Sequence, residues 1–200
     1  MFRKIYKKIF PHHIRGRNNI VDINKVGRKV RIYINGNNNV IKIEEVKCLL
    51  DLQISIFGDN NYIEIKKHAR IYGPCLIRAE FGSKIMIDQN VGLRGVTMLA
   101  KNARISIGAD CMTSYNVIIR NHDSHDVLSI VNGEPVNPSK DIVIGKHVWL
   151  AQNTTILKGV NIGSNSIVGF GAVVTKNIPD NSIAAGNPAK VVKSDVTWKA

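Results

Sequence analysis

The chain has 200 residues, of which 44% are apolar and 22% are charged, a composition that supports a folded core and argues against disorder. Charges interrupt every long apolar stretch, the N-terminal one included, so the sequence predicts neither a membrane span nor a signal peptide. We therefore expect one cytoplasmic domain. The cysteines, Cys48, Cys75 and Cys111, are widely spaced without a CxxC pattern, which is typical of buried apolar positions rather than of disulfides or a zinc site.

The net charge of +13 is concentrated at the start of the chain, where residues 1–31 hold ten Lys and Arg against a single acidic residue. The remaining residues have an ordinary balance, so the charge does not indicate a nucleic-acid-binding surface. We predict that residues 1–26 form a basic cap segment. Its apolar residues at helical spacing would either cover the end of the domain or lie on an anionic membrane surface; they are Phe2, Ile5, Tyr6, Ile9 and Phe10.

Two copies of one pattern follow, INGNNNVIKI at residues 34–43 and IFGDNNYIEI at residues 56–65. Both place Gly and Asn, which tolerate the positive φ of a tight corner, between alternating strands. Beyond them, apolar or small residues recur every sixth position with one slip, and we expect their side chains to point inward. These positions are Phe81, Ile87, Leu93, Leu99 and Ile105, then Ile107, Thr113 and Ile119.

After residue 142 the six-residue period is unbroken, and small residues follow most of its aliphatic positions. The aliphatic residues are Ile144, Leu150, Ile156, Ile162, Val168 and Val174. Such a repeat predicts a parallel β-helix, in which each hexamer forms a short strand and a corner and coils stack at about 4.8 Å. Residues 120–141 break the period with two Pro, so we predict a loop that leaves the β-helix; such loops often carry function.

Residues 142–192, with HVW near their start and VVTKNIP and AGNPAK near their end, resemble the C-terminal half of hexapeptide-repeat O-acetyltransferases, a family that includes maltose and galactoside acetyltransferases. The DSH at 123–125 before the loop is closer to members that act on capsular polysaccharide, polysialic acid or other cell-surface glycans. The resemblance implies an all-β fold, a left-handed parallel β-helix over residues 27–192 with a tail at 193–200. It also implies acetyl-CoA as co-substrate, no metal and a homotrimer with the cofactor between neighbouring chains.

Acetyl transfer from a thioester to a sugar hydroxyl needs a base for the hydroxyl proton and an acid for the departing thiolate. One histidine can fill both roles, since its ordinary pKa is near 6.5. The resemblance places His125 at the family's catalytic histidine. His122 is the rival candidate and a possible substrate contact. Asp123 would orient the imidazole, contact the acceptor or cap a turn.

The resemblance also assigns cofactor positions, with Trp149 shaping the site beside the coenzyme. The backbone of Gln152 and Phe170 would hold the pantetheine arm, and three further residues would meet the nucleotide end: Thr175, Lys176 and Lys190. On the acceptor side, Arg94 or Gly95 stands where maltose and galactoside enzymes carry an acceptor-binding Asn. An Arg there suits the carboxylate of an acidic sugar.

We therefore expect an acetyl-CoA-dependent O-acetyltransferase that acts on a cell-surface or capsular saccharide. The same donor and scaffold would also serve an amino-sugar nucleotide or an antibiotic as acceptor. A metal-dependent enzyme of the carbonic-anhydrase type would need His122, His125 and His147 to converge on zinc. A non-catalytic scaffold is the remaining alternative.

Overall fold

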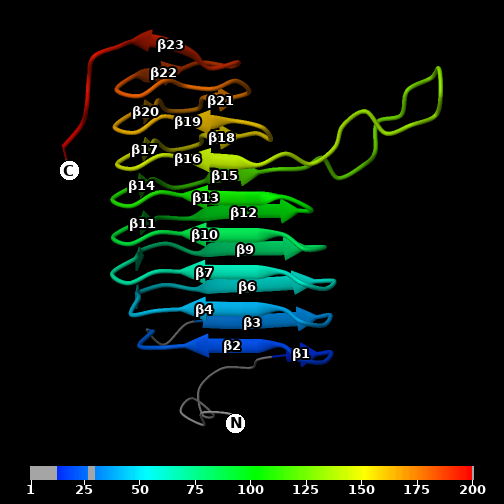
Figure 1. The fold of residues 1–200 in the computed structure, drawn as a ribbon. Coiled ribbons are helices and arrows are strands. Elements are labelled where there is room, and N and C mark those ends of the chain that lie inside the picture. Colours follow the sequence, from blue (N-terminus) through cyan, green and yellow to red (C-terminus); the bar gives the residue numbers. More distant parts are fainter. Residues whose placement is uncertain (1–12, 27–29, 200) are drawn as a thin grey trace.

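The computed structural model describes residues 13–26 and 30–199, which form a three-sided parallel β-helix (Figure 1). Successive coils contribute strands to three sheets in turn, with an isolated bridge in place of one strand in the first coil and in the last. The first sheet contains β1 (His13–Arg15), β3 (Val30–Asn35), β6 (Leu52–Phe57), β9 (Cys75–Glu80), β12 (Val96–Lys101), β15 (Val117–Arg120), β18 (Thr155–Ile156) and β21 (Val173–Val174).

The other two sheets complete the coils. The second contains β2 (Ile20–Ile23), β4 (Val40–Ile43), β7 (Tyr62–Ile65), β10 (Lys84–Ile87), β13 (Arg104–Ile107), β16 (Ile142–Ile144) and β19 (Asn161–Ile162). The third contains β5 (Lys47–Cys48), β8 (Arg70–Ile71), β11 (Gly92–Leu93), β14 (Met112–Thr113), β17 (Trp149–Leu150), β20 (Ile167–Val168), β22 (Ile183–Ala185) and β23 (Lys190–Lys193). We call the edge between the first and second sheets the first corner, and the edge from the third sheet to the next coil the third corner.

The predicted all-β parallel β-helix is therefore confirmed. Within the described ranges, the chain has no helix long and apolar enough to cross a bilayer.

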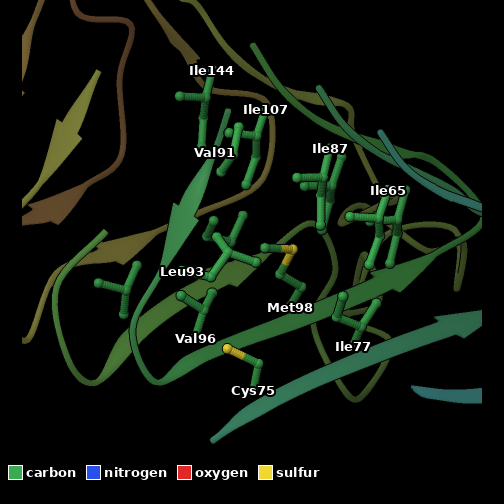
Figure 2. Packing of buried hydrophobic residues seen from close by; sticks show 14 of the residues in the cluster. Ile65, Cys75, Ile77, Ile87, Val91, Leu93, Val96, Met98, Ile107 and Ile144 are labelled. Carbon is green, nitrogen blue, oxygen red and sulfur yellow. The ribbon is translucent and has the colours of Figure 1, made fainter. Parts of the chain in front are cut away.

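A dry aliphatic column fills the axis of the β-helix (Figure 2). The aliphatic residues predicted after residue 142 are all buried, and the small residue that follows most of them lets the next coil approach closely. At Gly163, for example, a Cβ atom would lie only 2.2 Å from the backbone nitrogen of Asp180. The cysteines are also buried, and burial raises the pKa of Cys48 to about 11 and that of Cys111 to about 12. They behave as small apolar residues, as predicted.

Two of the inward positions predicted upstream are wrong. Phe81 is 54% exposed, with φ at 52°, and Leu99 is only half-buried on the outer face of β12. The cause is strand length, because β9 and β12 are six-residue strands whose side chains alternate between the core and the outside. In β12 the residues that point inward are therefore Val96, Met98 and Ala100 (Figure 2 labels the first two).

Asparagine forms the first corner in the early coils, as the repeated pattern predicts. Asn38 and Asn60 have φ values of 55° and 59°. Behind them, Asn39 and Asn61 are buried, and the Asn39 Oδ1 atom accepts hydrogen bonds from the backbone N and the Nδ2 atom of Asn61, both at 2.9 Å. This ladder satisfies buried polar groups from one coil to the next.

The ends of the β-helix differ from the expected boundaries. Strands β1 and β2 fall inside the segment predicted as a cap, and both pair in parallel with the following coil, so the β-helix is already formed at His13 rather than at residue 27. The reason is that Ile20–Ile23 continues the alternation of Val40–Ile43. The predicted amphipathic stretch at residues 2–10 lies outside the described residues. At the other end, β23 runs antiparallel to β22 and ends the parallel stacking.

Candidate active site

The predicted loop leaves the β-helix at the first corner, between β15 and β16, and extends far from the coils (Figure 1). Its two arms meet at a bridge between Leu128 and Pro135, and the Val136 N–H donates to the Val127 carbonyl at 2.8 Å. The tip is apolar and open to solvent, and the Ile130 side chain is fully exposed. The loop is therefore an ordered projection rather than part of the core.

His125 lies in the outgoing arm of this loop, and its side chain is exposed. Its backbone carbonyl accepts a hydrogen bond from the Nδ2 atom of Asn137 in the returning arm, at 2.9 Å. The Oδ1 atom of the same Asn137 accepts from the Val127 N–H at 2.7 Å. The structure thus exposes the imidazole and holds the backbone at His125 and two residues after it.

The Asp123 carboxylate bonds to Lys158 and Asn137. Its Oδ2 atom accepts from Lys158 Nζ at 2.5 Å and from Asn137 Nδ2 at 2.7 Å. The hydrogen bond from Lys158 is the main cause of a lowered Asp123 pKa, and the Asn137 amide adds to it. The sequence makes Asp123 a candidate to orient His125, to contact the acceptor or to cap a turn. In the structure its carboxylate contacts residues at the base of the loop.

The rival histidine, His122, is half-buried where the loop begins. Its Nδ1 atom lies 2.8 Å from the Asp123 carbonyl oxygen. The Arg120 guanidinium braces this arm, donating to the His122 carbonyl at 2.8 Å and to Ser124 Oγ at 2.6 Å. His125 is thus the more accessible of the two imidazoles.

Trp149 lies on the outer face of the third sheet, since it alternates with the buried Leu150 in β17. In a three-sided coil this sheet is opposite the first corner, and Figure 1 shows β17 and the loop on opposite sides. Trp198, from the C-terminal tail, lies beside it, with 6.1 Å between the ring centroids. The Trp198 ring stacks on His147 at 4.3 Å, and its Nε1 atom donates to the His147 carbonyl at 2.8 Å.

The other residues assigned to the cofactor lie at different corners of the β-helix. Gln152 and Phe170 are neighbours at the third corner, where the Gly171 N–H donates to the Gln152 carbonyl at 3.0 Å. Thr175 and Lys176 follow β21 at the first corner, on the loop side of the β-helix. Lys190 begins β23 at the end of the domain. A single chain does not bring these residues together.

Arg94 also lies at the third corner, two coils before Gln152. Its side chain is exposed, its N–H donates to Thr113 Oγ1 at 3.1 Å, and its guanidinium lies 5.3 Å from the centre of the Tyr72 ring. It thus shares an edge of the β-helix with Gln152 and Phe170.

The three histidines considered for zinc do not converge, because His147 is at the opposite side from the loop that carries His122 and His125. In the part of the chain that the structure describes, no three His, Cys, Asp or Glu residues form a group that could hold a metal ion.

Sequence reasoning missed Lys158, Asn137 and Arg120. Lys158 lies 35 positions after Asp123, in a Leu-Lys-Gly segment whose sequence is typical of any surface turn. Only the stacking of successive coils brings the two charges together.

A three-sided parallel β-helix of short repeats is the fold that the sequence resemblance to hexapeptide-repeat transferases implied. Residues 141–176 match the family model described as bacterial transferase hexapeptide (six repeats). The polysialic acid O-acetyltransferase of Neisseria meningitidis is 35% identical over 187 residues, which cover 92% of this chain and 86% of the relative. The chain therefore belongs to the hexapeptide-repeat O-acetyltransferase family, as its sequence resemblance implied.

Two further comparisons agree. The polysialic acid O-acetyltransferase of Escherichia coli O1:K1 / APEC is 39% identical over 138 residues, which cover 68% of this chain but only 44% of that longer relative. The crystal structure of the polySia specific acetyltransferase NeuO superposes with a TM-score of 0.91 at 34% identity, over 98% of this chain and 84% of that one.

Proposed function

We propose that this protein is an acetyl-CoA-dependent O-acetyltransferase that acts on a cell-surface or capsular saccharide, with His125 as general base. Family membership supports the reaction class, and relatives named for polysialic acid support the substrate class. The observation that carries the proposal is the exposed imidazole of His125 on an ordered loop at the edge of a rigid scaffold.

In this mechanism the His125 imidazole takes the proton of the acceptor hydroxyl as its oxygen attacks the thioester carbonyl carbon. The new C–O bond forms directly, the C–S bond breaks, and the sulfur leaves with the bonding electrons. The imidazolium returns its proton to the thiolate, so the products are the acetyl ester and coenzyme A. The thioester is already activated, and no covalent intermediate on the protein is needed.

An anionic sugar is the acceptor that suits Arg94. The exposed guanidinium can form a bidentate contact with a sugar carboxylate, whereas a neutral disaccharide would leave it without a partner. The location of Arg94 on the same edge as Gln152 and Phe170 supports a shared cleft for acceptor and coenzyme.

We further propose that the site is completed between copies of the chain in a homotrimer. Within one chain, Trp149 and His125 are on opposite sides of the coils. A neighbouring copy would bring its loop to the third sheet, and closed symmetry would repeat this contact at each interface. The exposed apolar tip of the loop favours such a contact.

Replacing His125 by Ala should lower kcat by a factor of about 10² to 10⁴ and leave coenzyme A binding nearly unchanged, because only the acid/base group is lost. Thiol release from acetyl-CoA, with a sialic acid polymer as acceptor, measures kcat. Calorimetry with coenzyme A measures its binding. His122→Ala is the matched control. A severe loss in His122→Ala together with a mild effect of His125→Ala would contradict the assignment.

Mixing two inactive variants tests the shared site. His125→Ala and Trp149→Ala chains, unfolded and refolded together, should regain part of the wild-type activity, since some interfaces then pair an intact loop with an intact third sheet. Each variant refolded alone provides the baseline. Activity that stays at this baseline, in mixtures shown by mass spectrometry to contain both chains, would rule out a site shared in this way.

A further inference from the structure

We infer that Asn137 and Lys158 are positioning residues that hold His125 in place through Asp123, an arrangement we call the loop clasp. The inference rests on the proposed role of His125 as the base. It assigns roles to two residues that do not touch the reacting atoms.

Lys158 is the anchor of the loop clasp on the rigid part of the molecule. It follows β18 at the first corner, where backbone hydrogen bonds hold both neighbours: Leu157 N to the Val174 carbonyl at 3.0 Å and Gly159 N to the Asp141 carbonyl at 3.1 Å. Its side chain is only 22% exposed. The ammonium group donates to Asp123 Oδ2 at 2.5 Å and to the Asn137 carbonyl at 3.0 Å, so one cation binds both arms of the loop.

Asn137 joins the two arms through its amide. Its two N–H bonds are used on Asp123 Oδ2 at 2.7 Å and the His125 carbonyl at 2.9 Å, and its Oδ1 atom accepts from the Val127 N–H at 2.7 Å. One side chain therefore holds the Asp123 carboxylate before His125, the carbonyl of His125 itself and the backbone N–H of Val127 after it. No other amino acid offers two donors and an acceptor on so short a stem.

The position of His125 matters because general-base catalysis depends on geometry. A displacement of about 1 Å at a reacting group can cost about 100-fold in rate. Beyond the loop clasp, the exposed hairpin that joins Leu128 to Pro135 projects away from the coils (Figure 1). The loop clasp lies outside the buried column, so the β-helix itself does not depend on it.

The test compares Asn137→Ala and Lys158→Met with wild type, using full-length protein, acetyl-CoA and a sialic acid polymer. We expect kcat to fall by about 10- to 100-fold in each variant, with the KM for acetyl-CoA within twofold and an unchanged melting temperature. Lys158→Arg should recover much of the activity, because a cation remains within reach of Asp123. Lys140→Met is the matched control, since it removes a lysine of the same edge that is outside the loop clasp, and should retain full activity.

A double variant separates a loss of His125 positioning from a general loss of activity. Asp123→Asn combined with Lys158→Met should be no worse than the more damaging single change, because both break the same contact. Three results would each overturn the inference. The first is a double variant whose loss of kcat is the sum of the two single losses. The others are an unchanged kcat in Asn137→Ala and Lys158→Met, and a loss of kcat that follows a fall in melting temperature.

His125→Ala is measured in parallel: if it is fully active, both the proposed base and the loop clasp are wrong. If His125→Ala is inactive while the clasp variants are fully active, only the loop clasp is wrong.

Discussion

The coils before the loop and those after it bury the same kind of core with different repeats. Before the loop, a coil has strands of six, four and two residues, and Val30 pairs with Leu52, 22 positions later. After the loop, the coil of β18, β19 and β20 has strands of two residues each, and Thr155 pairs with Val173, 18 positions later. Three sides of six residues give 18, which is why only the later coils show the six-residue period clearly.

The difference shows that a parallel β-helix depends on inward aliphatic residues and tight corners rather than on a fixed period. In both regions the chain turns at glycines where a Cβ atom would clash with the next coil, such as Gly36 and Gly163. Both regions also turn at asparagines with positive φ, such as Asn60 and Asn165. Both designs exclude water equally well, since Ile54 and Ile156 are each fully buried. Three pairs of substitutions, one member in each region, test this comparison.

The largest effect is expected at glycine. Gly163→Ala places a Cβ 2.2 Å from the backbone nitrogen of Asp180, so the next coil must move, and we expect a loss of more than about 4 kcal/mol in the free energy of unfolding. Gly92→Ala, in an early coil, meets only the Met112 side chain at 3.9 Å and should stay within about 0.5 kcal/mol of wild type. Urea unfolding followed by circular dichroism measures both. Equal losses of unfolding free energy would show that the close approach of the next coil at Gly163 does not distinguish the two sites.

A smaller effect, equal in the two regions, is expected in the core. Ile54→Ala and Ile156→Ala should each destabilise the protein by about 2–5 kcal/mol, because both remove a fully buried side chain and leave a cavity. The same urea experiment applies, with Ile→Val at each position as the milder control, at about 0.5–1.5 kcal/mol. A much lower cost in one region would mean that its core is less tightly packed.

The smallest effect is expected at asparagine corners. Asn60→Ala and Asn165→Ala, at φ values of 59° and 62°, should each cost about 1–2 kcal/mol, because Ala disfavours the left-handed conformation. Gly at either position should restore most of the stability. If Gly is as harmful as Ala, side-chain hydrogen bonds such as that from Asn165 Nδ2 to Asn181 Oδ1 matter more than the backbone conformation.

The sequence could be interpreted correctly where local rules decide the structure. Each hexamer after residue 142 is one side of a coil, so Ile156 and Val168 could be placed inward from their spacing alone. The same rule failed at Phe81 and Leu99, because the early strands are longer and alternate. The loop was recognisable from its prolines and its break in the period. The hydrogen bonds within the loop were not recognisable, since nothing in the sequence around Asn137 or Lys158 indicates their partners.

The sequence by itself determined a three-sided β-helix with one protruding loop, because inward aliphatic residues, small corner residues and a break in the repeat are local properties of the chain. Only the tertiary structure decided which distant residues meet. Stacking of coils brings Lys158 beside Asp123, 35 positions away, and the three-sided cross-section places Trp149 opposite His125. The physical reason is that neighbours across coils depend on the summed lengths of all the sides and loops between them, which no single repeat encodes.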